Sequence, residues 1–327
     1  MRVVTTSLVA LALTLSVYPL FADALPGENL VFQQKPMEQT NIFGQTFFGH
    51  NEVSTAVNQL VGAPVDAYAG TFMADDFAVR SSEPITHIRF WGDYLENRPS
   101  VVQKFFISFE QDIPAGPNVS FSRPGTPLLS QIVTRGAISP GSGTFDELAV
   151  VPVPPFGETP LAYNAELAAP FVPTPNTVYW LKIVALTEPT LVQPNPLEPK
   201  FQWGWHNRDY TVENTFGLRP PAVVPGEFVT VSPIPEQPPI WHFQDDAVGG
   251  QVNIIDFLLP RPGVFEVEQT GLAPKTYVSP ADGPTFIAQF SKDLAFELYA
   301  VPEPSTLGLT IAGMLGLGLY WLRRSRD

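Results

Sequence analysis

Residues 176–186 read NTVYWLKIVAL and carry the pattern that decides the fold. The segment is apolar on both faces of an extended chain, and β-branched and aromatic residues predominate, which is typical of a central β-strand. Residues 84–94, PITHIRFWGDY, alternate instead. The alternation predicts a strand with two different faces, one presenting Ile85, His87, Arg89 and Trp91 and the other Thr86, Ile88 and Phe90.

Short segments of this kind recur along the chain, each bounded by Pro, Gly, Asn or Asp. No helical periodicity of useful length interrupts them, and proline, at 36 of 327 residues, clusters in the extended loops between them. The candidate strands are 71–79, 85–94, 102–110, 128–135, 145–153, 162–168, 177–185, 201–206, 240–244, 252–258 and 294–300.

These strands predict an all-β protein with a single large β-sandwich of two sheets, jelly-roll-like, over residues 71–300. The strands do not alternate with helices, which argues against an α/β enzyme fold. Residues 25–70 are polar and contain scattered glycines. We expect them to form a loosely packed lead-in with one strand at most, IFGQTFF at 42–48.

Charge and cysteine content limit the possible partners. The chain carries a net charge of −14 and contains no cysteine. An acidic surface repels phosphate backbones, so we expect no nucleic-acid partner; it suits divalent cations or neutral polysaccharide. The lack of cysteine excludes a disulfide framework, thiol nucleophiles and thiolate metal sites.

The C-terminal residues 301–327, VPEPSTLGLTIAGMLGLGLYWLRRSRD, differ in character from the body. Residues 306–322 carry no charge, and at about 1.5 Å rise per residue they come close to spanning a bilayer core, so we predict one transmembrane helix there. Arg323, Arg324 and Arg326 follow, and the positive-inside rule leaves them in the cytoplasm with the body outside. A buried C-terminal helix is the alternative, although such a helix needs no arginine stop.

The N-terminal residues also predict export. Arg2 precedes an apolar stretch over 3–20, and Ala22-Asp23-Ala24 has the small-residue pattern of a signal-peptide cleavage site. We predict a signal peptide over 1–24 that is cleaved after Ala24. A permanent N-terminal anchor is the alternative.

The tail resembles the PEP-CTERM sorting signal, because Pro302-Glu303-Pro304, an apolar helix and the basic end at Arg323, Arg324 and Arg326 stand in that order. The resemblance implies that the partner is an exosortase, a membrane-embedded cysteine protease of Gram-negative bacteria that make exopolysaccharide. The precursor would sit in the inner membrane with its body outside. After cleavage near the motif, which its prolines keep extended, the body would pass to the cell surface or the extracellular matrix.

The body resembles an uncharacterised β domain of secreted bacterial proteins over roughly 70–300. The segments that carry the resemblance are ADDF, PITHIRFWGDY, FFISFEQDIPAGPNVSFSRPGTPL, VYWLKIVAL, WGWHNRD, HFQDDAV and LAFELY. This resemblance implies a fold and a location, and it implies no chemistry.

Two aspartate doublets, Asp75-Asp76 and Asp245-Asp246, form a candidate calcium site. Adjacent carboxylates repel one another unless they are solvated or share a cation, and Ca²⁺ takes six to eight oxygen ligands. In the alternative, one aspartate of each pair faces water while the other caps a turn or accepts backbone N–H groups. No EF-hand loop strengthens the calcium hypothesis.

Four tryptophans, Trp91, Trp203, Trp205 and Trp241, form a candidate carbohydrate-binding surface. Trp203 and Trp205 lie two residues apart, hence on one face of a strand, and a row of exposed rings would stack on sugars. We favour the alternative, in which these rings belong to the core of a large sandwich.

The sequence contains no H-E-x-x-H, G-x-S-x-G or phosphate-loop motif, and its four histidines are too scattered to suggest a site. We therefore predict a non-enzymatic structural or interaction protein of the cell surface or the exopolysaccharide matrix. A carbohydrate-binding module that uses the tryptophans and a secreted hydrolase that uses a carboxylate pair are the alternatives.

Overall fold

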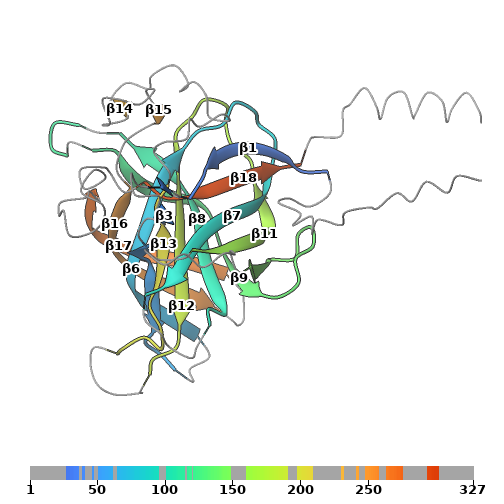
Figure 1. The fold of residues 1–327 in the computed structure, drawn as a ribbon. Helices are drawn as coiled ribbons and strands as arrows, with labels where there is room; N and C mark the ends of the chain where they lie inside the picture. The colour runs from blue at the N-terminus through green and yellow to red at the C-terminus, as the bar shows by residue number, and fades with distance from the viewer. Residues whose placement is uncertain are drawn as a thin grey trace, which may run out of the picture.

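The computed structural model describes residues 27–36, 39–40, 46–47, 51–61, 65–95, 101–114, 116–119, 121–148, 160–190, 197–208, 230–231, 241–242, 247–257, 263–274 and 293–301. Within these ranges every strand or helix that is assigned is a β-strand (Figure 1), so the all-β prediction is confirmed. Among the described residues, no helix has the length and apolar character needed to cross a bilayer. The predicted signal peptide and the predicted helix 306–322 lie outside the described residues.

The strands differ widely in length, and several are longer than the sequence pattern predicted. In chain order they are β1 (Asn29–Gln34), β2 (Gln39–Thr40), β3 (Thr46–Phe47), β4 (Asn51–Val53), β5 (Thr55–Asn58), β6 (Val65–Phe77), β7 (Ile85–Tyr94), β8 (Lys104–Ile113), β9 (Arg123–Arg135), β10 (Thr144–Leu148), β11 (Leu161–Phe171), β12 (Tyr179–Thr187), β13 (Trp203–His206), β14 (Thr230–Val231), β15 (Trp241–His242), β16 (Val248–Phe257), β17 (Gly263–Pro274) and β18 (Phe296–Ala300).

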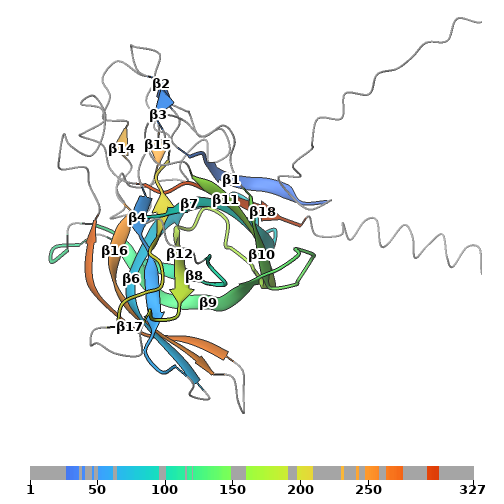
Figure 2. The same ribbon diagram turned by 60° about the horizontal axis from the view of Figure 1, so that its bottom comes forward.

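Hydrogen bonds join the main strands into one sheet in the order β1-β18-β7-β11-β10-β9-β8-β12-β5-β6-β16-β17, and β13 pairs with both β7 and β4. The sheet is strongly curved. The ring of Phe90 on β7 lies 5.1 Å from that of Phe105 on β8, although β11, β10 and β9 separate these strands in the sheet. Figure 2 shows the strands arranged around a common interior. The face-to-face packing of a sandwich is therefore present, but it comes from the curvature of one sheet rather than from two separate sheets.

The interior is an aromatic core. Alternation along β7 sends Ile88 and Phe90 inward, where the Phe90 ring stacks on Tyr163 at 5.2 Å and meets Trp203 edge-on at 5.9 Å. Aromatic pairs of this kind add about 0.5–1.5 kcal/mol beyond the area they bury. The predicted central strand, β12, is buried at every residue. Its second face, with Trp180, joins a smaller core made with β6 and β16.

The structure corrects the expectation of a loosely packed lead-in over 25–70. β5 is buried along its whole length and pairs with β12 and β6. β6 begins at Val65, so the predicted boundary at residue 71 falls inside a strand. Phe32 of β1 is 1% exposed and stacks on Phe296 at 4.9 Å. The segment looks polar because β1 and β5 hold only short apolar runs, Leu30–Phe32 and Ala56–Val57, between Asn, Gln and Thr.

Candidate functional site

Many of the predicted site residues lie outside the described part of the chain. These are Ala22, Ala24, Asp245, Asp246, Pro302, Glu303, Pro304, Arg323, Arg324 and Arg326. Trp241 lies in β15, where the description does not extend to its side chain. The hypotheses that rest on these residues remain predictions.

The other three tryptophans do not form a binding surface. Trp203 and Trp205 of β13 are completely buried, and Trp91 of β7 is 6% exposed. Trp203 meets the ring of Phe105 edge-on at 4.9 Å, and the indole N–H of Trp205 donates to the carbonyl oxygen of Ala295 at 2.9 Å. The prediction of a row that stacks on sugars is therefore wrong for these three rings, and the core interpretation is confirmed for them.

Asp75 belongs to a buried cluster of two acids and one arginine. Its Oδ2 accepts the N–H of Leu294 at 2.8 Å, and its Oδ1 accepts the N–H of Asp76 at 3.0 Å. Arg208 Nε lies 3.2 Å from Asp293 Oδ2. Burial, followed by the charge of Asp293, raises the pKa of Asp75 well above its usual range. Burial also raises the pKa of Asp293 to about 7, an effect that Arg208 opposes.

These contacts bear on the calcium hypothesis. Asp75 accepts backbone N–H groups, as the alternative interpretation expected, whereas Asp76 is 1% exposed and does not face water. Arg208 supplies positive charge where calcium was expected to supply it. The sharing of calcium between Asp75 and Asp245 stays a prediction, because Asp245 lies outside the described residues.

A second set of polar side chains lies on the face of the sheet opposite the aromatic core. Strand register aligns Tyr299 of β18, His87 of β7 and Glu166 of β11 across three neighbouring strands. The next row on this face is made of Glu297, Arg89 and Asn164. We call these two rows the polar strip. It confirms the predicted alternation of β7 for His87 and Arg89, which point away from the face of Ile88 and Phe90. The prediction is wrong for Ile85, which belongs to the core of Ile88 and Phe90, because the register shifts at this end of the strand.

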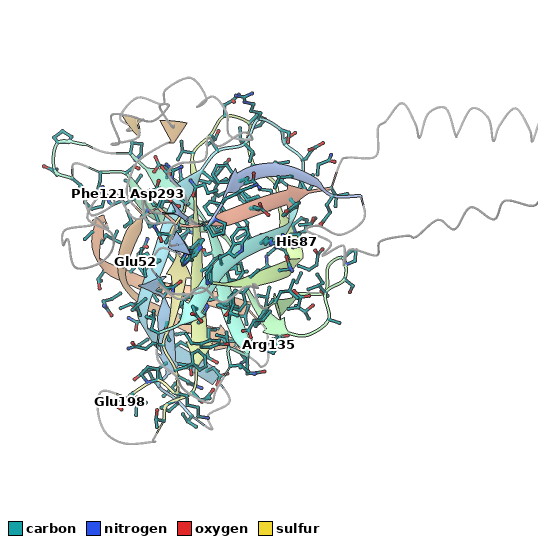
Figure 3. The ribbon with its side chains drawn as sticks, viewed as in Figure 1. Glu52, His87, Phe121, Arg135, Glu198 and Asp293 are labelled. Carbon is teal, nitrogen blue, oxygen red and sulfur yellow. The ribbon has the colours of Figure 1, made fainter. Side chains whose placement is uncertain are left out.

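Glu28, His87 and Glu166 form an acid–histidine cluster at one row of the polar strip. His87 Nδ1 lies 3.1 Å from Glu28 Oε2, and one potential metal-ligand atom from each residue lies within 4.8 Å of the other two. The side chains of Glu28 and His87 are 3% and 1% exposed, and Glu166 is 1% exposed. Figure 3 labels His87 on its strand. The cluster therefore joins the residue preceding β1 to two strands inside the sheet.

Neighbouring groups orient the two carboxylates of the cluster. Thr86 Oγ1 donates to Glu28 Oε1 at 2.5 Å, and the backbone N–H of Gly141 donates to Glu166 Oε1 at 3.0 Å. Gly141 has a φ of 70°, a left-handed conformation that glycine adopts readily. Among the described residues, no hydrogen-bond partner reaches the buried His87 Nε2 or Glu166 Oε2. Each residue thus retains capacity for one more contact.

The cluster contains more acidic than basic groups. Burial raises the pKa of Glu166 to about 7; the N–H of Gly141 opposes this rise, the charge of Glu28 adds to it, and His87 opposes it. Two carboxylates and one imidazole occupy a site with little water, and an unpaired buried charge is costly. Such a group can hold an extra proton near neutral pH or bind a cation.

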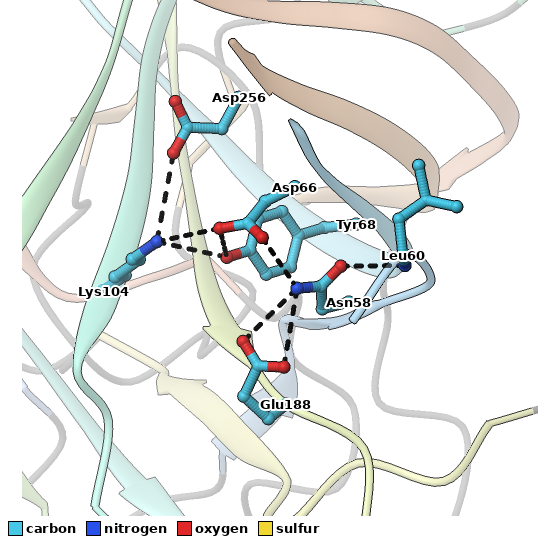
Figure 4. Close-up of polar contacts among 7 residues, drawn as sticks. All are labelled: Asn58, Leu60, Asp66, Tyr68, Lys104, Glu188 and Asp256. Carbon is cyan, nitrogen blue, oxygen red and sulfur yellow. Dashed lines mark hydrogen bonds and ion pairs between the residues drawn. The ribbon is translucent and has the colours of Figure 1, made fainter. Parts of the chain in front are cut away.

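A third polar group surrounds Lys104 (Figure 4). Lys104 Nζ lies 3.1 Å from Asp66 Oδ2 and 3.9 Å from Asp256 Oδ2. The Tyr68 hydroxyl donates to Asp66 Oδ2 at 3.1 Å, and the Asn58 amide donates to Asp66 Oδ1 at 3.0 Å. A cavity of about 330 Å³ lies against Tyr68 and Lys104. The side chains of Lys104, Asp66 and Asp256 are 32%, 17% and 14% exposed, so water screens their charges, and we interpret this group as structural.

Sequence reasoning did not predict the acid–histidine cluster. His87 was placed on the correct face, but the histidines seemed too scattered for a site, and Glu28 and Glu166 lie far from His87 in sequence. One signal was present in the candidate strand 162–168, AYNAELA. It places Asn164 and Glu166 on one face between apolar residues, which indicates a polar face that needs partners.

Comparison with known proteins yields one match. A family model described as a domain of unknown function, DUF7901, matches residues 32–243. No curated protein and no solved structure matches the chain. The match begins within β1, which agrees with the finding that residues before 70 form part of the sheet, and it includes His87 and Glu166. Because it covers well over half of the 327 residues, the chain belongs to the DUF7901 family.

Proposed function

We propose that this protein is exported, is held in the inner membrane as a precursor, and then serves as a structural or interaction protein at the cell surface or in the exopolysaccharide matrix. The observation that carries the proposal is the ordered tail. Pro302-Glu303-Pro304 precedes an uncharged segment over 306–322, and Arg323, Arg324 and Arg326 follow it. In this proposal an exosortase is the processing partner.

The strand pairing of the body is compatible with anchoring of the precursor through its C-terminal tail. Asn29 of β1 pairs with Ala300 of β18, so the residues that follow the predicted cleavage at Ala24 run beside those that precede Pro302. β18 also pairs with β7 and is therefore held on both sides. A pull on the tail would act on a strand inside the sheet, which resists peeling better than an edge strand.

The two alternative functions are weaker. Burial removes Trp91, Trp203 and Trp205 as a surface for sugars. A carbohydrate-binding module would therefore need another site. No described arrangement specifically favours a hydrolase, so we retain the structural or interaction role, which the acidic charge of the chain suits in a hydrated matrix.

The test of this proposal is the processing of the tail in a host that makes an exosortase. We expect the change of Pro302, Glu303 and Pro304 to alanine to leave full-length precursor in the inner membrane, because the motif sits at the membrane boundary. A matched control changes Pro194, Asn195 and Pro196 to alanine and should be processed like the wild type. Intact mass and cell fractionation give the readout; normal processing of the Pro302–Pro304 variant would contradict the proposal.

A further inference from the structure

We propose that Glu28, His87 and Glu166 bind one divalent transition-metal ion of the zinc type. The ligands would be one imidazole nitrogen and one oxygen from each carboxylate, with a fourth position left for water. The proposal is independent of how the protein is exported, because it rests on the described residues alone.

Charge is the first reason. The cluster places two carboxylates beside one imidazole, and all three side chains are almost fully buried. Buried negative charges need compensating positive charge from a basic side chain, from protons or from a bound cation. One doubly charged ion would balance both carboxylates and would leave His87 neutral, which is the state in which imidazole binds metals.

The unused atoms are the second reason. Thr86 and Gly141 donate to the Oε1 atoms of Glu28 and Glu166, which resembles the outer hydrogen bonds that orient carboxylate ligands in metal sites. Glu166 Oε2 is buried and has no hydrogen-bond partner among the described residues, so it is available to an ion. His87 would bind that ion through Nδ1, the nitrogen that faces Glu28. Glu28 Oε2 lies 3.1 Å from His87 Nδ1, and a cation could replace the proton between them.

Distances and ligand types select the class of metal. Bond lengths of about 2.0–2.2 Å with tetrahedral angles place ligand atoms roughly 3.3–3.5 Å apart. The His87–Glu28 contact is 3.1 Å and no separation exceeds 4.8 Å, so small side-chain movements close the site. Calcium and magnesium prefer oxygen ligands, whereas imidazole suits zinc and its neighbours. The chain has no cysteine, so a thiolate site is not possible.

The position of the cluster indicates what the ion would do. Glu28 lies directly before β1, and β18 lies between β1 and β7 in the sheet. An ion held by Glu28, His87 and Glu166 would tie the start of the domain to β7 and β11. In a chain without cysteine, it would act as the cross-link that a disulfide supplies elsewhere.

The test measures zinc binding by the full-length chain purified in detergent. After removal of metal with a chelator, we expect the wild type to take up one tightly bound Zn²⁺ per chain and to melt a few degrees higher with zinc than without it. Co²⁺ in place of Zn²⁺ should show the intense visible absorption of a tetrahedral site. X-ray absorption of the zinc form should show an imidazole ligand.

Two variants assign the site. Glu166→Gln and His87→Gln should each weaken zinc binding by at least about tenfold, since even outer-shell changes usually cost 10–100-fold. The matched control, Glu147→Gln, removes a partly buried carboxylate from β10 and should bind zinc like the wild type. If a variant fails to fold, the spectra of wild-type protein still decide. The absence of a tight site, of the tetrahedral cobalt spectrum or of an imidazole ligand, or equal binding by all variants, would overturn the proposal.

Discussion

Two buried groups of charged side chains on the same sheet balance their charges differently. Lys182 of β12 and Glu110 of β8 lie 2.6 Å apart, and both side chains are fully buried. Lys182 also donates to Gln269 Oε1 at 3.1 Å and lies 4.1 Å from the centre of the Phe72 ring. The acid–histidine cluster of Glu28, His87 and Glu166 is almost as deeply buried, but its three members are two acids and one imidazole.

The balance of charge separates a structural ion pair from a candidate binding site. A buried pair with one charge of each sign is complete within the protein, and removal of either partner leaves an uncompensated charge. A buried group with excess negative charge is incomplete, so it draws on the solvent for protons or metal ions. The Lys104 group also has more acid than base and borders a cavity, but it is the weaker candidate because its side chains are partly exposed and water screens their charges.

The largest expected effect comes from breaking the complete pair. Lys182→Met should lower the free energy of unfolding by about 3–5 kcal/mol, because Glu110 then stays buried without its cation. Urea unfolding at neutral pH measures the change. The double variant Lys182→Met with Glu110→Gln should recover much of the loss. A loss of less than about 1 kcal/mol for Lys182→Met would show that the Lys182–Glu110 pair does not stabilise the fold.

The sequence predicted the strands well where burial follows a local pattern. β7 was predicted with its observed bounds, Ile85–Tyr94, because polar and apolar residues alternate along its middle and a proline precedes it. β12 was predicted to be central because both of its faces are apolar. The pattern of β17 was missed, since GVFEVEQTGLAP mixes glycine, glutamate and threonine and lies at the edge of the sheet.

The site could be predicted only in part, because it depends on register. The outward direction of His87 follows from alternation in one strand. Its neighbours depend on the register of β11 and β18 against β7, which places Glu166 and Tyr299 opposite His87. Register across strands far apart in sequence is set by the packing of the whole core, which a single local pattern does not contain.

The second expected effect concerns the Asp75–Asp293–Arg208 cluster. In its balance of charge it lies between the Lys182–Glu110 pair and the acid–histidine cluster. Asp293 has an ordinary pKa of 3.8 that burial raises to about 7 in the folded protein. The folded state therefore holds a proton that the unfolded chain releases, and the stability contributed by this proton is full below about pH 4. It is lost as the pH rises toward 7, at up to about 1.4 kcal/mol for each pH unit.

Asp293→Asn tests this pH dependence. The change removes one titrating group and the charge that raises the pKa of Asp75, so the dependence of stability on pH between about 4 and 7 should flatten. Thermal melts across that range give the slope. An unchanged slope would place the titration elsewhere in the protein.

The smallest expected effect comes from a pair near the surface. Arg135 Nη2 lies 2.7 Å from Glu147 Oε2, and these side chains are 27% and 15% exposed. Glu147→Gln should cost no more than about 1 kcal/mol, since water and salt screen such pairs. Urea unfolding at low and high salt measures it. A cost near that of Lys182→Met would remove the contrast between buried and near-surface pairs.

The most direct test of the contrast is the position of a metal ion at the incomplete cluster. Crystals of the protein grown with zinc can be measured on both sides of the zinc absorption edge, which locates the ion independently of any variant. We predict one strong anomalous peak about 2.0–2.2 Å from ligand atoms of Glu28, His87 and Glu166. Strong zinc peaks elsewhere in the crystal, with none at this cluster, would contradict the account.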